Sequence, residues 1–294
     1  MSGPAFANGK GLAVVVNGAA GSPGSDDAPE DLARDLPDAE LIVVDDSTPF
    51  ADALAQASRA SVLGIVGGDG SINAAAERAL GAHLPIAVFP GGTLNHFARD
   101  LGLTDATDTI RALRHGDVVE VDVGTIHGKP FLNTASFGMY AELVDARERL
   151  EGRLGKWAAM LIAAVRVLRH AEPVRVELDG ERLGIWMIFI GNCEYQPAGL
   201  APAERPRLDD GLFDVRYVDD AIARSRSRLL AALATGRLSR ANVFTRRLVS
   251  SLEIRSLDGP LRLARDGETF DGDVNVHIAK HPDRLTVYAP KREG

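Results

Sequence analysis

The hydrophobic pattern of the first 120 residues alternates between short apolar runs and amphipathic stretches. Four continuous apolar runs each end in asparagine, aspartate, glycine or proline, which is typical of buried strands followed by tight turns. They lie at residues 12–16, 41–44, 62–66 and 86–89. Helical spacing is found between them, at residues 31–36, 49–59 and 72–80. This order predicts an α/β domain with a parallel sheet covered on both faces.

The pattern changes after about residue 122, where strand candidates become longer and follow one another. They lie at residues 117–126, 129–135, 174–178, 183–190, 212–218, 251–256, 261–264, 274–278 and 284–288. Helical stretches near residues 140–170 and 221–236 interrupt them. The succession predicts a second domain of antiparallel strands. We therefore divide the chain into residues 1–122 and 123–294.

Composition and charge narrow the class of protein. A chain of 294 residues with 45% hydrophobic residues can bury a core, and its single cysteine, Cys193, excludes a disulfide framework. The formal net charge of −8 makes nucleic acid a poor partner. The first residues lack the pattern of a secretory signal, and no stretch of about 20 apolar residues occurs. We expect a cytoplasmic protein.

The segment Gly67-Gly68-Asp69-Gly70-Ser71 follows the third predicted strand and opens a helix. Glycines there expose backbone N–H groups, and a helix N-terminus attracts anions, so phosphate is the expected ligand. Asp69 would repel phosphate unless it acts on Mg²⁺ or on a proton. The alternative is a plain tight turn with Ser71 as the helix cap.

A second loop of the same kind, residues 90–95, follows the fourth strand. Its Thr93 is either a hydroxyl donor to phosphate or the N-cap of the next helix. Neither loop matches the P-loop pattern, and the segment after the first strand lacks the dinucleotide-binding glycine pattern. Two glycine loops at neighbouring strand ends therefore predict a phosphate site of another type.

Three segments, at residues 17–21, 67–71 and 92–99, resemble the nucleotide-site motifs of the diacylglycerol kinase catalytic-domain family, which includes bacterial soluble lipid kinases and sphingosine kinases. Further matches follow in order at residues 121–124, 131–133, 208–215 and 266–268. The resemblance implies an N-terminal domain like that of NAD kinases and phosphofructokinases and a C-terminal β-sandwich that binds the lipid. It implies transfer of the γ-phosphoryl group of ATP to a lipid hydroxyl, such as that of diacylglycerol.

The resemblance also assigns roles by position. The implied contacts with ATP are Asn17, Gly18, Gly21, Ser47, Gly67, Gly68, Asp69, Gly70, Ser71, Asn73 and Thr93. Glu268 would accept the proton of the lipid hydroxyl, while Asp69 and Asp122 would complete a network around Mg²⁺. Asp210, with the carbonyls of Arg207 and Leu212, would hold a second, structural Mg²⁺. From the residues alone, Glu268 and Asp210 also fit ordinary turns, and residues 179–181 repeat the Asp-Gly-Glu of residues 266–268.

Residues 221–247 contain seven arginines and no acidic residue. The segment fits either transient contact with an anionic membrane, at the inner membrane face, or an ordinary surface helix.

The sequence does not fix the oligomeric state, and a homodimer is one candidate. Two other functions stay open: an NAD kinase-like enzyme with a soluble substrate, and a non-catalytic lipid-binding regulator. Gly18 and Ser22, which depart from the family's usual residues, favour the second.

Overall fold

The protein is described by a computed structural model that covers residues 3–18, 28–138, 172–197, 204–225, 227–228 and 244–290. Its chain forms two compact units, which are described separately below. The first comprises residues 1–123 and 281–294, and the second comprises residues 124–280. The sequence analysis had placed every residue after 122 in the second domain, whereas the C-terminal strand returns to the first unit.

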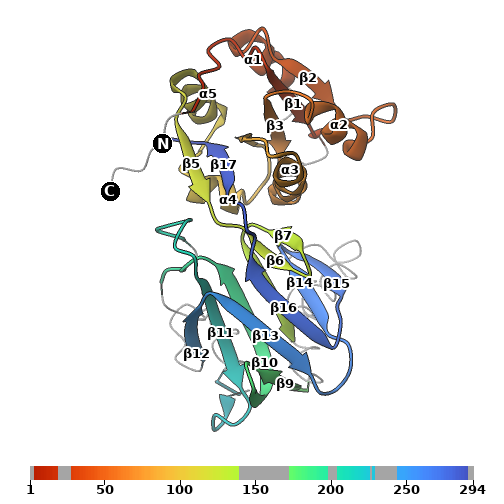
Figure 1. Cartoon of the computed structure of the whole chain (residues 1–294), viewed down its shortest axis with the longest axis vertical. Helices are drawn as coiled ribbons and strands as arrows, with labels where there is room; N and C mark the ends of the chain where they lie inside the picture. Colours follow the sequence, from red (N-terminus) through yellow and green to blue (C-terminus); the bar gives the residue numbers. More distant parts are fainter. Residues whose placement is uncertain are drawn as a thin grey trace. The chain divides into compact units, whose positions relative to one another are not determined.

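The first unit is built on a twisted sheet with the strand order β2-β1-β3-β4-β17-β5 (Figure 1). The strands are β1 (Leu12–Val16), β2 (Glu40–Val43), β3 (Val62–Gly67), β4 (Ile86–Pro90), β5 (Val118–Val121) and β17 (Leu285–Tyr288). The first four are mutually parallel, which confirms the predicted α/β architecture. Because β1, β3 and β4 are neighbours, the loops that follow them lie at one edge of the sheet.

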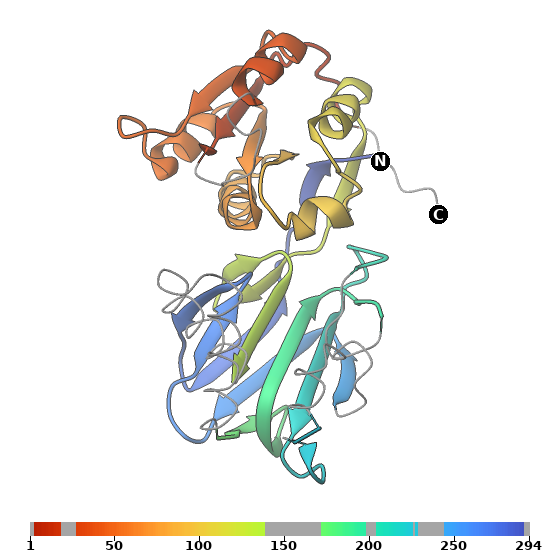
Figure 2. The same ribbon diagram turned by 180° about the vertical axis from the view of Figure 1, so that it is seen from behind.

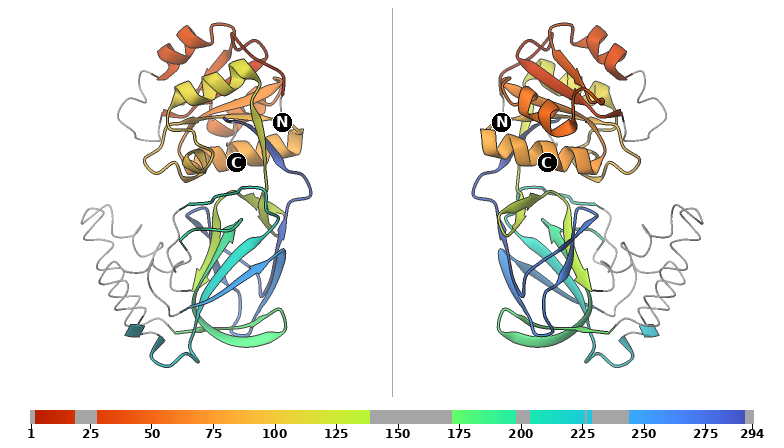
Figure 3. Two further views of the ribbon diagram at one scale, coloured as in Figure 1. Left: turned by 90° about the vertical axis from the view of Figure 1, so that its left-hand side faces the viewer. Right: turned by 90° about the vertical axis from the view of Figure 1, so that its right-hand side faces the viewer.

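Helices cover both faces of this sheet. They are α1 (Ala28–Asp35), α2 (Phe50–Ala57), α3 (Asp69–Ala82), α4 (His96–Asp100) and α5 (Ala106–His115). Figure 3 shows α1 and α5 on one face and α2 and α3 on the other, and side chains of α1 and α5 share one core cluster. The sequence analysis missed α5, although Asp105 caps its N-terminus and Gly116, with φ +68°, ends it. Both are standard signals for helix ends.

Strand β17 lies between β4 and β5, parallel to the first and antiparallel to the second. Leu285, Val287 and Tyr288 are buried there. A strand at this place supplies the backbone hydrogen bonds that the facing edges of β4 and β5 require. The apolar pattern of residues 284–288 predicted a strand, but no local signal identifies its partners.

The second unit is an antiparallel, sandwich-like β structure, as predicted (Figure 2). Its described strands are β6 (Gly124–Ile126), β7 (Lys129–Phe131), β8 (Thr134–Gly138), β9 (Val174–Leu178), β10 (Glu181–Asn192), β11 (Phe213–Asp219), β12 (Thr245–Val249), β13 (Ser251–Ser256), β14 (Arg262–Arg265), β15 (Glu268–Asp271) and β16 (Asn275–Lys280). Apolar side chains from most of them form one core. The single strand predicted at residues 117–126 is in fact β5 and β6, which belong to different sheets.

The predicted helical stretches at residues 140–170 and 221–236 lie wholly or mostly outside the described residues. Within the described part of the chain, no helix combines the length and the apolar character needed to cross a bilayer.

A buried charge cluster ties β11 to β12. Asp214 and Arg216, both fully buried on β11, form an ion pair, and Arg246 of β12 donates to both carboxylate oxygens of Asp214 at 2.9 Å. Arg216 also donates to the carbonyls of Tyr195 and Pro197. The cluster is therefore well hydrogen-bonded, which a buried ion pair requires.

We expect Asp214→Asn to lower the free energy of unfolding by about 3–5 kcal/mol near neutral pH, because two guanidinium groups lose their shared counter-charge. Burial alone raises the pKa of Asp214, but hydrogen bonds from Arg216, Arg246 and the Tyr195 amide outweigh it and hold the pKa below its ordinary value. A carboxylate with a lowered pKa stabilises the fold above its ordinary pKa and loses this effect as the pH falls.

Urea unfolding of wild type and variant from about pH 7 to about pH 3 checks this expectation, since an unperturbed aspartate titrates near pH 4. The difference in unfolding free energy between the two proteins should become smaller as the pH falls. A difference that does not change with pH would contradict the assigned role of the Asp214 charge.

Candidate functional site

A pocket of about 380 Å³ lies at the carboxyl ends of β1, β3 and β4. Most of its lining comes from the glycine-containing loops that the sequence singled out. The lining residues are Asn17, Gly68, Asp69, Gly70, Ser71, Gly92, Thr93 and Leu94. In parallel α/β sheets this edge is where ligands bind, so the structure gathers the predicted phosphate loops at the expected place.

Two glycines allow close packing at this site, Gly92 between the loops after β3 and β4 and Gly67 within the loop after β3. A Cβ atom on Gly92 would lie 2.5 Å from the Cα atom of Gly68, and one on Gly67 would lie 2.6 Å from the Cβ atom of Ser71. The amide of Gly91 donates to the carbonyl of Gly67 at 3.0 Å. A Cβ atom at Gly92 would therefore require the backbone to move, and one at Gly67 would displace the Ser71 side chain.

The first loop is joined to the start of α3 by a side-chain hydrogen bond. Asn17 Nδ2 donates to Ser71 Oγ at 3.0 Å. The N-cap of α3 is Gly68, so the alternative interpretation of Ser71 as the helix cap is wrong. Two residues further along α3, Asn73 Oδ1 is buried and has no hydrogen-bond partner among the described residues. A buried acceptor of this kind is costly unless something donates to it.

Asp69 has a structural role in addition to its predicted chemistry. Its two carboxylate oxygens accept from the amides of His96 and Phe97, each at 3.2 Å, and so cap α4. The N-cap residue of α4 is Asn95, so the interpretation of Thr93 as that N-cap is wrong. Each Asp69 oxygen retains lone-pair capacity beyond these single bonds. The carboxylate can therefore fix the loop and still accept a cation.

Five predicted contacts are not among the residues that line the pocket. Two of them, Gly67 and Asn73, flank its lining residues 68–71 along the chain, and the other three lie elsewhere or are not described. Ser47 is not among the residues that line the pocket, and its hydroxyl and amide both donate to Asp45 Oδ1 in an exposed turn. The hydrogen bond from the Ser47 hydroxyl is the main reason why the pKa of Asp45 is lowered. Gly18 follows Asn17 but does not line the pocket, and Gly21 lies outside the described residues.

Asp122 follows β5 and is buried, and Arg284 Nε donates to its Oδ1 at 2.8 Å. The sequence analysis did not identify Arg284, because 162 residues separate the two. Only the pairing of β17 with β5, which places Leu285 opposite Val121, brings the guanidinium to the carboxylate.

In the second unit, Asp210 ties its own loop to the end of β10. Its carboxylate accepts from the amides of Glu194 and Leu212, both at 2.8 Å, and the carbonyl of Leu212 accepts from the Cys193 amide. Arg207, in the same loop, donates its Nε to Asp209. The oxygen atoms of this loop are hard ligands with lone pairs left, the type that Mg²⁺ prefers.

Glu268 is exposed at the start of β15, opposite Arg265. Asp266 and Gly267, with φ of +46° and +89°, make the two-residue turn between β14 and β15. The expected hairpin turn is therefore present, and Glu268 is the first residue of the strand that follows it, β15. Asp69 and Asp122 belong to the first unit, whereas Glu268 and Asp210 belong to the second.

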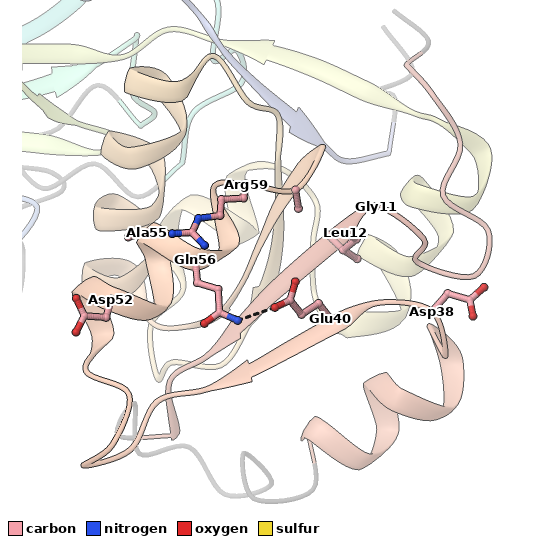
Figure 4. A pocket seen from close by; sticks show the side chains of 9 residues that line it. Gly11, Leu12, Asp38, Glu40, Asp52, Ala55, Gln56 and Arg59 are labelled. Atoms are coloured by element: carbon pink, nitrogen blue, oxygen red, sulfur yellow. Dashed lines mark hydrogen bonds between the residues drawn. The ribbon is translucent and has the colours of Figure 1, made fainter.

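A larger hollow of about 700 Å³ lies at the opposite, amino end of β1 and β2 (Figure 4). Gln56 Nε2 donates to Glu40 at 2.6 Å across it, while Asp38 and Asp52 lie near its two ends and point away from each other. Its charged groups do not converge on a common point, so we do not place the functional site there.

Residues 11–126 match the family described as diacylglycerol kinase catalytic domain, and residues 134–289 match the YegS C-terminal NAD kinase beta sandwich-like domain. A Pseudomonas syringae pv. tomato protein named "Probable lipid kinase YegS-like" is 31% identical over 81% of this chain and 78% of its own. A Staphylococcus carnosus "Diacylglycerol kinase" is 27% identical over 82% of each. A crystal structure of a diacylglycerol kinase from Bacillus anthracis, at 20% identity, superposes with a TM-score of 0.68 over 96% of this chain and 97% of its own.

The close approach of the loops gives a direct test. We expect Gly92→Ala to lower the unfolding free energy by about 1–3 kcal/mol, because its Cβ atom would clash with the backbone of Gly68. Gly81→Ala in α3 is the matched control, since a Cβ atom there meets nothing within 4 Å. Relief of helical glycine entropy should make the control more stable by about 0.5–1 kcal/mol. Thermal unfolding of both variants checks this, and equal melting temperatures would contradict it.

Proposed function

Because the chain belongs to the diacylglycerol kinase catalytic-domain family, we propose that it is an ATP- and Mg²⁺-dependent lipid kinase. In the proposed reaction the γ-phosphoryl group of ATP passes to a lipid hydroxyl, such as that of diacylglycerol. The observation that carries this proposal is the pocket formed by the loops after β1, β3 and β4, at the N-terminus of α3.

The proposed nucleotide contacts are mainly backbone groups. Gly68, Gly70 and Ser71 present N–H groups at the start of α3, where the helix dipole favours phosphate. Asn17 and Thr93 add side-chain donors at the rim of the pocket. The three loops, residues 17–27, 67–73 and 90–95, contain no lysine or arginine. Their only charged side chains are acidic: Asp26, Asp27 and Asp69.

Mg²⁺ would neutralise the phosphate oxygens, which these loops cannot do with their own side chains. Asp69 and Asp122 are its proposed carboxylate partners, and Arg284 holds Asp122 in one orientation. A second, structural Mg²⁺ is proposed at Asp210 with the carbonyls of Arg207 and Leu212. The all-oxygen donor set of that loop suits a hard cation.

Glu268 is the proposed proton acceptor. Its carboxylate would take the proton of the lipid hydroxyl as that oxygen forms a bond to the γ-phosphorus atom. The bond between this phosphorus and the bridging oxygen then breaks, and ADP leaves. A positioned general base of this kind typically contributes about 10²–10⁴-fold to a rate.

Contact with a membrane surface is a further part of the proposal. It rests on the arginine content of residues 221–247, most of which lie outside the described residues. We propose transient binding at the inner membrane face, since a lipid substrate has to be reached there. The assignment of nucleotide binding to the first unit and of lipid binding to the second, and the candidate homodimer, also stay proposals.

The catalytic assignment can be tested with a pair of matched substitutions. We expect Glu268→Gln to lower kcat for phosphate transfer from ATP to diacylglycerol by about 10²–10⁴-fold, because the general base is lost. Glu181→Gln is the control: it alters the same position of the other Asp-Gly-Glu turn, residues 179–181, where Glu181 pairs with Arg247. Radiolabelled ATP and mixed micelles give the measurement. Full activity of Glu268→Gln would refute the assignment of the base, and a wild type inactive on every lipid hydroxyl would refute the substrate class.

The absence of basic residues in the three loops predicts that nucleotide binding requires the metal. With ATP at about 100 times its Kd, Mg²⁺-ATP should stabilise the protein by about 2.7 kcal/mol in a thermal-shift assay. ATP with excess EDTA should give little or no shift, because the Asp69 carboxylate then meets the phosphates without a metal ion and the three loops contain no basic residue. Equal shifts with and without the metal would contradict this prediction. No shift in either condition would favour the non-catalytic regulator.

A further inference from the structure

The second unit contains the same tripeptide, Asp-Gly-Glu, at two hairpin turns. Residues 179–181 connect β9 to β10, and residues 266–268 connect β14 to β15. The backbone is nearly the same in both, with φ of +48° and +85° at Asp179 and Gly180 and of +46° and +89° at Asp266 and Gly267. The turn itself therefore gives no reason for the two sites to differ.

The two aspartate side chains have different surroundings. Asp266 accepts three backbone amides: Leu132 donates to Oδ2 at 2.8 Å, and Asn133 and Thr134 donate to Oδ1 at 2.8 and 2.9 Å. The amide of Asp266 itself donates to the carbonyl of Thr134 at 2.8 Å. Asp179 is exposed, and its carboxylate accepts the Glu253 amide at 3.0 Å. Only the first arrangement docks a turn onto a distant loop through both of its carboxylate oxygens.

The loop that Asp266 holds is itself fixed from its carbonyl side. Arg205, 2% exposed, donates to the carbonyl of Leu132 at 2.6 Å and to Asn133 Oδ1 at 2.8 Å. Asn192 donates its Nδ2 to the Leu132 carbonyl and its amide to the Asn133 carbonyl. The loop thus turns three N–H groups to a carboxylate, while the Leu132 carbonyl and the Asn133 side chain accept from a buried guanidinium. Residues 132–134 form a rigid support for the β14–β15 turn.

The support at residues 132–134 lies against the turn that carries Glu268. Strand β15 ends the described sheet and pairs with β14 alone, so Glu268 stands at an edge and has one strand neighbour. A general base must lie within hydrogen-bond reach of its proton, and a displacement of about 1 Å can cost about 10²-fold in rate. We propose that Asp266 is a positioning residue, which holds the turn so that Glu268 presents its carboxylate at a fixed place. This inference rests on the proposed function, in which Glu268 is the base.

Asp266→Asn is the sharpest test, because asparagine tolerates positive φ and keeps the turn. Its amide nitrogen, however, brings a donor to face one of the three loop N–H groups. We expect kcat to fall about tenfold or more while the KM for ATP changes by less than about twofold. Asp179→Asn, the same change in the twin turn, should leave both values unchanged.

Combining Asp266→Asn with Glu268→Gln distinguishes a positioning role from a non-specific loss of activity. In the Glu268→Gln protein, Asp266→Asn should lower the residual rate by less than about twofold, because the group it positions is already gone. Equal losses in both backgrounds would overturn the inference. If Asp266→Asn does not fold, Arg205→Lys, which weakens the other side of the support, should show the same dependence on Glu268.

Amide hydrogen exchange tests the docking without any reaction. In the wild type the amides of Leu132 and Asn133, which belong to a loop, should exchange slowly, and Asp266→Asn should speed their exchange and that of residues 268–271. Fast exchange in the wild type would overturn the inference, whatever the activity. A wild type that transfers no phosphate to a lipid would overturn the proposed function and the catalytic part of the inference, and the exchange result would still decide whether Asp266 docks the turn.

Discussion

The candidate site depends on one steric constraint, the approach of two backbone segments without side chains between them. The loops after β3 and β4 meet where Gly92 passes Gly68, and an ordinary Cβ atom on Gly92 has no room there. This contact is available because β3 and β4 are parallel neighbours that end at the same edge. With the loops together, Asp69 reaches the amides at the start of α4 and fixes the second loop against the first helix turn of α3. The pocket is therefore shaped by backbone, and its charge is set by a carboxylate.

Much of the fold follows from local patterns. Continuous apolar runs located β1 to β4, and their alternation with helical spacing gave the parallel sheet, because a strand covered on both faces needs apolar residues at every position. Helix α5 was missed despite its local signals, whereas two strands were misassigned or missed because they depend on distant partners or carry weak patterns. The β17 strand was predicted as a strand but was assigned to the second domain, since only its pairing with β4 and β5 places it in the first. Strand β12 lacks a clear apolar alternation, because Arg246 and Arg247 lie in its middle. It is held instead by the ion pairs of these arginines with Asp214 and Glu181.

The candidate site was predictable to the extent that its residues lie in loops directly after predicted strands. Asn17, Gly68 to Ser71 and Thr93 line one pocket because each follows or opens an element whose type the sequence shows. Ser47 does not join them, since Asp45 captures its hydroxyl and amide within the same turn. Arg284 could not be found in this way, because its partner Asp122 lies 162 residues earlier. The alternatives for Ser71 and Thr93 failed for a related reason: each helix begins at a different residue from the one a capping rule selects.

The paired Asp-Gly-Glu turns show most directly where sequence reasoning ends. The tripeptide fixes the local conformation, because Asp and Gly accept positive φ, and both copies fold in nearly the same way. What the turn can do is decided by the groups that face its aspartate. At residue 179 the carboxylate accepts an amide at the surface, whereas at residue 266 it accepts three from a loop that Arg205 and Asn192 hold on the other side. A motif of three residues therefore specifies a turn, and only the second copy, anchored by contacts more than 130 residues apart, is built to keep a glutamate in place.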